Sequence, residues 1–453
     1  MLKPKQSGNQ VIDDFIRYTQ SNYAIIEGGK MEFIPYDQFK NIEFIAEGGF
    51  SKIYKAIWVN GPINNWDEIK HNDWNITRNN NYTVVLKKLN NSKNITSKEL
   101  NELKILYQIA SSTKNLYIGH LSEYFGITQE PNTKDIVFIM EYYALGDLMH
   151  YLNNDFYNIS WETKLYGLWN ITNGFCLIHG TGITHRDLHS GNIFFDGNLS
   201  YIGDLGISKS ATECTNNNNE KYGIIPYMAP EIFQGQKYTK ALDIYSFGMI
   251  MREFMTGRRP FWNENHDIEL IIKICDGLRP PIVTNAPEGY IELMKSCWHS
   301  DPNKRPTALD IFYGVDKIWA NEINLIQTKI IESSDIGPVI TNNTGAIYKS
   351  RPLSRMINSA MSLRNSRSQS IDPFYYYQKN NAAFIDKRKF NNSIEDGNDN
   401  GTKIKLCTRR KLFGNENSEY FAKEIELDIN KNLNEPQNNE YVTKEFDIDI
   451  NNI

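Results

Sequence analysis

The chain has 453 residues, of which 40% are hydrophobic and 23% charged, so it is long and apolar enough to bury a sizeable core. Its formal net charge of −5 argues against binding nucleic acid or a membrane surface through bulk positive charge. The five cysteines lie far apart without any Cys-x-x-Cys pair, so the sequence indicates neither a zinc site nor a disulfide framework and suits a reducing compartment.

Composition divides the chain into three parts. Residues 1–40 are a polar N-terminal extension with one amphipathic stretch at 11–16. Residues 41–320 carry nearly all of the strand and helix patterning. Residues 333–453 are rich in Asn, Ser, Lys and Asp and show little periodicity, so we expect a low-complexity and largely disordered tail.

The sequence shows no targeting or membrane-spanning segment. The first residues are polar, and no run approaches the roughly 18 apolar residues that a membrane helix needs. We therefore expect a cytoplasmic protein that does not insert into membranes.

The patterned region begins with elements of strand character. Short stretches rich in β-branched and aromatic residues predict strands at 44–45, 52–58, 83–87 and 136–141. The polar insert 60–81 predicts a loop, and helical spacing of leucines predicts a helix over 97–109.

Helical patterns dominate after Gly146. They predict helices over 161–179, 240–256, 268–276, 289–298 and 307–319. A small strand-rich part with one main helix therefore precedes a larger helical part, and the two join near residues 142–147. This order predicts an α+β fold.

Three polar residues in the second part have the chemistry of a metal and phosphate clamp. Asp187 and Asn192 share a short loop, and Asp204 follows them in an Asp-Leu-Gly turn. An aspartate can accept a proton from a hydroxyl, and carboxylate and amide oxygens suit Mg²⁺. The sequence therefore predicts that Asn192 and Asp204 flank one short hairpin.

The first part offers complementary groups for phosphate. Lys87 ends an apolar strand, which places a fixed cation against the wall of a cleft. Residues 46–51, with the sequence Ala-Glu-Gly-Gly-Phe-Ser, form a turn of small residues that can approach phosphate groups closely.

Taken in order, these motifs resemble the signature of the eukaryotic protein kinases over about 280 residues, from Ile45 to about Trp319. The family's Ala-Pro-Glu motif is present at residues 229–231, and an Asp-x-Tyr-Ser-x-Gly motif is present at 243–248. Cys297-Trp298 followed by Arg305-Pro306 is similar to the end of the tyrosine-kinase-like serine/threonine kinases.

The resemblance implies a two-lobed protein-kinase fold with an N-lobe over about 41–141 and a C-lobe over about 146–320. It also implies that Lys87 holds ATP phosphates and pairs with Glu102 on the following helix, with Glu99 as the alternative. Lys88 should point to the other side of the strand, because side chains alternate.

Further roles follow from the same resemblance. Asp187 would accept or orient the proton of the attacking hydroxyl, and Asn192 and Asp204 would hold Mg²⁺. Glu231 would pair with Arg305 in a structural role. The residues implied to line the ATP site are Ile45, Ala46, Glu47, Gly48, Gly49, Phe50, Ser51, Lys52, Ile53, Val85, Lys87, Met140 as gatekeeper, Glu141 and Tyr143 of the hinge, Asp147 at the ribose and Phe194 under the ring.

The sequence departs from the family pattern at several positions. Ala46 and Ser51 replace glycines of the phosphate loop, and a Cβ there restricts positive φ, so we expect weaker or slower nucleotide handling. His189 and Ile224 stand where serine/threonine kinases usually carry Lys and Thr, whereas Tyr227 favours that class over the tyrosine kinases.

Regulation by phosphorylation is suggested at two places. Arg186 can pair with a phosphate on the loop 204–231, where Ser208, Ser210, Thr212, Thr215 and Tyr222 remain alternatives. In the basic stretch 351–370, Ser354 and Ser370 follow Arg-x-x and are candidates for phosphorylation by a basic-directed kinase, although a solvated linker is the simpler interpretation of that stretch.

We therefore expect an ATP- and Mg²⁺-dependent kinase that phosphorylates Ser/Thr of protein substrates in intracellular signalling, with dual specificity left open. The alternative is a pseudokinase scaffold, which the degenerate phosphate loop and Ile224 favour. Phosphotransfer to a small molecule is a weaker interpretation, because the Ala-Pro-Glu motif and the long segment before it resemble kinases that bind peptides.

Overall fold

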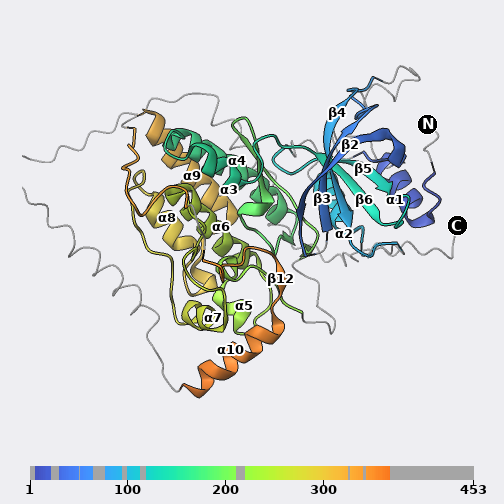
Figure 1. Cartoon of the computed structure of the whole chain (residues 1–453). Coiled ribbons are helices and arrows are strands. Elements are labelled where there is room, and N and C mark those ends of the chain that lie inside the picture. Colours follow the sequence, from blue (N-terminus) through green and yellow to red (C-terminus); the bar gives the residue numbers. More distant parts are fainter. Residues whose placement is uncertain are drawn as a thin grey trace, which may run out of the picture. The chain divides into compact units, whose positions relative to one another are not determined.

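The computed structural model describes residues 6–21, 30–49, 51–64, 77–93, 99–112, 119–210, 220–324, 327–339 and 343–367. They form a strand-rich N-lobe and a helical C-lobe, followed by a segment that packs on the C-lobe (Figure 1). The predicted α+β, two-lobed architecture is confirmed.

A six-stranded sheet forms the N-lobe, in the order β1-β5-β6-β4-β3-β2. β1 runs parallel to β5, and the other neighbours are antiparallel. The strands are β1 (Glu32–Phe33), β2 (Phe39–Glu47), β3 (Ser51–Trp58), β4 (Tyr82–Leu89), β5 (Tyr124–Gln129) and β6 (Ile136–Glu141).

Alternation along the central strands separates two apolar faces. Val84 and Leu86 of β4 pack with Val137 and Ile139 of β6 on one face. Phe138 lies on the opposite face, in the cluster that includes residues of α2 (Asn101–Ser112) and of α1 (Gln10–Ser21). This follows from the two-residue period of a strand, and it leaves the next β4 residue, Lys87, on the side of α2.

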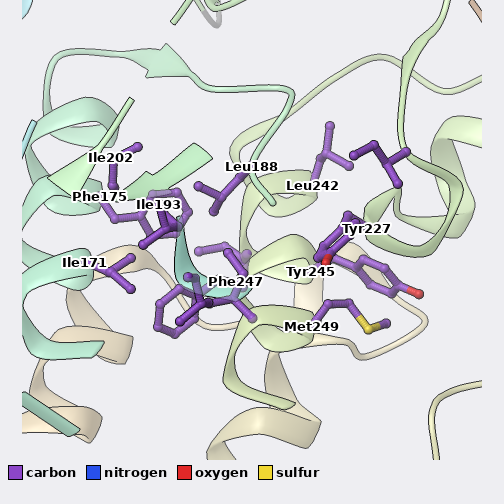
Figure 2. Packing of buried hydrophobic residues seen from close by; sticks show 14 of the residues in the cluster. Ile171, Phe175, Leu188, Ile193, Ile202, Tyr227, Leu242, Tyr245, Phe247 and Met249 are labelled. Carbon is purple, nitrogen blue, oxygen red and sulfur yellow. The ribbon is translucent and has the colours of Figure 1, made fainter. Parts of the chain in front are cut away.

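The helices of the C-lobe surround a continuous apolar core. They are α3 (Leu148–Asp155), α4 (Trp161–Gly180), α5 (Pro230–Phe233), α6 (Lys240–Thr256), α7 (Ile268–Cys275), α8 (Tyr290–Cys297) and α9 (Ala308–Asn324). Figure 2 shows Ile171 and Phe175 of α4 near Phe247 of α6, with Ile193 and Ile202 beside them. α6 is buried around nearly its whole circumference, so it is the central helix of this lobe.

Short strands carry the loops of the candidate site. β8 (Ile193–Asp196) and β9 (Leu199–Ile202) form a hairpin, and β7 (Ile183–Thr184) pairs with β10 (Lys209–Ser210). Single 3₁₀ turns lie at Tyr36–Gln38, Ser190–Asn192, Ile225–Tyr227 and Pro302–Lys304. The predicted hairpin between Asn192 and Asp204 is therefore present.

The expectation of a largely disordered tail is wrong for residues 343–367. Strand β12 (Arg351–Pro352) pairs with β11 (Tyr222–Gly223), and helix α10 (Ser354–Ser366) packs against α7 (Figure 1). The buried residues Leu353, Ile357 and Ala360 lie at helical spacing. Most residues of this segment are polar, so its composition does not reveal the narrow apolar face. The interpretation of 351–367 as a solvated linker is therefore also wrong. Residues 368–453, including Ser370, lie outside the described part.

Among the helices of the described ranges, none is both long and apolar enough to cross a lipid bilayer.

Candidate active site

A buried ion-pair cluster joins the two lobes. The Nζ of Lys87 on β4 lies 2.9 and 2.8 Å from the carboxylate oxygens of Glu102 on α2. It also lies 2.9 Å from Oδ1 of Asp204, which follows the β8–β9 hairpin of the C-lobe. One ammonium group therefore contacts two carboxylates from different lobes.

The charges in this cluster are set by burial and by one another. Burial lowers the pKa of Lys87, but Asp204 and Glu102 outweigh it and the net pKa is raised, so the ammonium stays charged. Burial raises the pKa of Asp204, but Lys87 outweighs that effect and the net pKa is lowered. The pKa of Glu102 is raised, mainly by burial, against the opposing effect of Lys87.

The neighbouring lysine occupies a different environment. Lys88 lies 3.6 Å from Glu130 and 3.5 Å from Asp135, away from the cluster. The alternation of strand side chains therefore separates the two lysines, as the sequence predicts. Of the two glutamates that the sequence leaves open, Glu102 is the one whose carboxylate contacts Lys87.

Tyr124 of β5 is a residue of this cluster that the sequence did not reveal. Its hydroxyl donates a hydrogen bond to Glu102, and both side chains are buried. This bond fixes the carboxylate that faces Lys87. A lone tyrosine in a strand carries no local signal for such a contact.

Hydrogen bonds to two carbonyl oxygens hold the loop of Asp187 and Asn192. The side-chain amide of Asn192 donates to the carbonyl oxygen of Asp187 over 2.9 Å. The backbone N–H of Gly203 donates to the carbonyl oxygen of Asn192 over 2.9 Å, which brings the turn of Asp204 against this loop. His189 Nε2 lies 3.8 Å from Asp187 Oδ2, a contact between charges only when the imidazole is protonated.

Asp243 at the start of α6 anchors the segment before Asp187. Its carboxylate accepts hydrogen bonds from the backbone N–H groups of His185 and Arg186 at 2.8 and 2.9 Å. Arg186 has φ of 73° and Asp204 has φ of 56°, a region that non-glycine residues enter only when their surroundings hold them there. The sequence placed Asp243 in a motif but did not reveal this anchoring role.

A second buried network lies behind the loop. Ser190 Oγ lies 3.0 Å from Tyr227 OH and 3.3 Å from Glu253 Oε1, and Tyr227 also donates to Glu253. Burial raises the pKa of Glu253 to about 7, against the opposing hydrogen bond of Tyr227. Glu253 lies on the buried central helix, and nothing local in the sequence pointed to it.

The residues expected around adenine lie at the junction of the lobes. Val85 pairs with Met140, and the ring of Phe194 stacks on Tyr143 with centroids 5.5 Å apart. Asp147 caps α3 by accepting from His150 N at 2.8 Å. Burial raises the pKa of Glu141 to about 7, although its hydrogen bond from Tyr82 opposes that shift.

The phosphate loop is a tight connection between β2 and β3. Ala46 pairs with Ile53, and Glu47 with Lys52, so Ala46 is an extended strand residue. The N–H of Gly48 donates to the carbonyl oxygen of Ser51 at 2.8 Å, which closes the turn. Ile45 is 49% exposed, and Phe50 lies outside the described part of the chain.

Comparison with known proteins identifies the family. Residues 39–314 match the model of the protein tyrosine and serine/threonine kinases, which is more than half of the chain. The chain belongs to this kinase family. The match covers strands β2 to β6 of the sheet, the Lys87 cluster and the Asp187 loop in one continuous range.

Individual relatives carry serine/threonine-kinase names. A putative serine/threonine-protein kinase/receptor of Acanthamoeba polyphaga mimivirus is 28% identical over 68% of this chain and 18% of its own length. A probable serine/threonine-protein kinase of Dictyostelium discoideum is 27% identical over 63% of this chain and 28% of its own length. The serine/threonine-protein kinase VIK of Arabidopsis thaliana is 27% identical over 62% of this chain and 60% of its own length. This chain therefore spans less than two thirds of each of these relatives.

The donors of this kinase domain fit a hard divalent cation. The side chain of Asp204 is 43% exposed although Lys87 holds one of its oxygens, so it remains accessible to a ligand. Asn192 uses its side-chain nitrogen toward Asp187, and this bond orients the amide group. A carboxylate and an amide oxygen are ligands that Mg²⁺ accepts.

Proposed function

We propose that this kinase domain transfers the γ-phosphate of ATP to serine or threonine hydroxyls of proteins. The observation that carries the proposal is the contact of the buried Lys87 with both Glu102 and the partly exposed Asp204. This contact fixes a cation from one lobe beside a carboxylate from the other. Such an arrangement suits phosphoryl transfer, which depends on positioning and charge neutralisation.

Residues of both lobes would bind the nucleotide. The turn 46–51 would cover the phosphates, Lys87 would contact them, and Asp204 and Asn192 would hold Mg²⁺, which neutralises phosphate charge. Val85, Met140 and Phe194 supply apolar surface for adenine, and Tyr143 stacks on Phe194 from the hinge.

We assign to Asp187 the contact with the acceptor hydroxyl of the protein substrate. Its carboxylate would orient the hydroxyl and take its proton as the bond to phosphorus forms. Asp243 supports this role because it fixes the two residues before Asp187 by their backbone N–H groups. The Ser190–Tyr227–Glu253 network supports the other end of the same loop.

The pseudokinase alternative rests on the phosphate loop and on Ile224. Ala46 lies in a regular strand pair, and neither Ala46 nor Ser51 has positive φ, so their side chains impose no backbone strain there. Ile224 is buried, with 4% exposure, and serves as packing. Together with the complete set of polar residues, these observations favour an active kinase.

Serine/threonine specificity is proposed from the names of the relatives and from Tyr227 before the Ala-Pro-Glu motif. A cytoplasmic signalling role, with ATP and protein substrates as partners, belongs to the same proposal.

The test is transfer of labelled phosphate from ATP and Mg²⁺ to a generic protein substrate by the full chain. We expect Asp187→Asn to lower the rate by about 10²–10⁴, whereas Asp196→Asn on the exposed hairpin leaves it unchanged. Label on phosphoserine or phosphothreonine supports the specificity, and label on phosphotyrosine contradicts it. Transfer by neither form, in a sample first treated with an activating kinase, while ATP still raises Tm, would establish the scaffold alternative.

A further inference from the structure

Residues 343–353, here called the strap, follow the surface between α6 and α7. Asn343 donates from its side-chain amide to the carbonyl oxygen of Asn263 at 3.2 Å, and His266 N donates to Gly345 O at 2.9 Å. The hydroxyl of Tyr348 donates to Pro260 O at 2.8 Å. These hydrogen bonds hold the strap, which begins with a turn at residues 343–346, against the connection between α6 and α7.

The strap ends on the segment that leads into the Ala-Pro-Glu motif. Arg351 and Pro352 pair antiparallel with Gly223 and Tyr222. The N–H of Leu353 donates to Lys221 O at 2.7 Å, so the pairing extends by one hydrogen bond. Addition of a strand to an exposed edge is a common means of binding an extended polypeptide.

Ser350 lies between this pairing and the phosphate loop. A Cβ added at Gly49 would come within 3.0 Å of the carbonyl oxygen of Ser350, so the strap passes directly against the loop. The hydroxyl of Ser350 is buried and has no hydrogen-bond partner among the described residues. A buried hydroxyl without a partner is uncommon and calls for an explanation.

Packing on both sides fixes the strap. The ring of Tyr348 meets His266 edge to face with centroids 4.8 Å apart, and the guanidinium of Arg259 lies 4.9 Å from the same ring. Leu353, the last residue of the strap, is 1% exposed. The following helix α10 packs on α7, where Arg364 contacts Asp276 at 2.8 Å.

We propose that the strap is an intramolecular substrate, with Ser350 as the acceptor hydroxyl of this kinase. The proposal rests on the proposed kinase function. Ser350 Oγ forms a bond to the γ-phosphorus of ATP, and the bond from that phosphorus to the β–γ bridging oxygen breaks. The proton of Ser350 passes to Asp187, and ADP leaves with the bonding electrons. The products are ADP and phosphoserine at position 350.

A competition follows from this arrangement. While the strap is paired with β11, an added protein substrate cannot use the same strand edge. Variants that release the strap should therefore lose phosphorylation of Ser350 and gain phosphorylation of added protein.

The experiment follows both products in the full chain, with mass spectrometry for Ser350 and labelled transfer to a generic protein substrate. In the wild type we expect phosphate on Ser350, formed at a rate independent of protein concentration and absent in Asp187→Asn. Leu353→Asp should lower that rate at least tenfold and raise kcat/KM for the added protein several-fold. Leu363→Asp, the same change at a side chain that is 45% exposed, should do neither.

The possible failures are distinguishable. If the added protein is phosphorylated and Ser350 is not, the assignment of Ser350 as acceptor is wrong. An increase in transfer to added protein by Leu353→Asp does not rescue that assignment. A rate on Ser350 that rises with protein concentration overturns the intramolecular assignment. Transfer to neither acceptor contradicts the kinase activity itself. If Leu353→Asp does not fold, Arg364→Ala, which removes the side-chain contacts with Asp276 and with the carbonyl oxygen of Cys275, should show the same changes in weaker form.

Discussion

Lys164 on α4 shows how strongly burial acts on a single residue. Its side chain is fully buried, and its Nζ has no hydrogen-bond partner among the described residues. The ammonium lies 3.8 Å from the ring centroid of Phe156 and 5.3 Å from that of Trp161. Burial lowers the pKa of Lys164 to about 7.

This shift predicts a pH-dependent stability. The lysine of the unfolded chain titrates near 10.4, so between about pH 7 and that value the unfolded state binds more protons and stability rises with pH. Lys164→Met removes this contribution and should stabilise the protein by about 2 kcal/mol at neutral pH, with a smaller gain at about pH 10. Urea unfolding of both proteins at the two pH values measures it, and an equal difference at both would contradict the assignment.

Sequence reasoning succeeds for residues whose neighbours along the chain define their role. Lys87 and Lys88 were separated by strand alternation, and the structure gives them different partners. The roles of Tyr124 and Glu253 could not be predicted from the sequence, because they depend on contacts with residues far away in the chain.

Among the structural elements, the buried pair of Glu231 and Arg305 ties the first turn of α5 to the turn before α9. The guanidinium bonds both carboxylate oxygens at 2.6 and 2.8 Å, and the side chains are 5% and 0% exposed. Arg305 also donates a hydrogen bond to the carbonyl oxygen of Ala241 at 2.8 Å. The same guanidinium therefore also contacts the start of α6. The expected pairing is confirmed.

The contribution of this buried ion pair to the free energy of unfolding can be compared with that of an exposed ion pair. Arg305→Met leaves Glu231 buried and unpaired, so it should destabilise the fold by about 3–5 kcal/mol. Arg367→Met breaks a similar contact with Glu269, in which the side chains are 51% and 49% exposed, and should cost about 0–1 kcal/mol. Thermal and denaturant unfolding measure both, and equal losses would refute the structural role of Glu231.

Helices with a strong apolar pattern were predicted with accurate ends. The predicted spans 161–179 and 240–256 match α4 and α6 to within one residue. α10 was not predicted, because its buried face is narrow and its other residues are polar. A helix of this kind is stabilised by the surface on which it packs, and the sequence of the helix alone does not show that surface.

At the scale of the whole molecule, the order of the motifs predicted two lobes and a site between them. The contact of Ser350 with Gly49 could not be predicted, because it joins distant segments through a surface that exists only after folding. The kinase domain and the strap are therefore one functional unit in this account. Lys87, which links the lobes through Glu102 and Asp204, is its central residue.

The most direct test compares two adjacent lysines of β4. We would measure kcat/KM for phosphate transfer by the wild type, Lys87→Met and Lys88→Met, after thermal unfolding shows that all three fold. We expect kcat/KM to fall by about 10²–10³ in Lys87→Met and by less than about threefold in Lys88→Met. Equal rates for the two variants, or full activity without Lys87, would contradict the assignment of this cluster as the phosphate site.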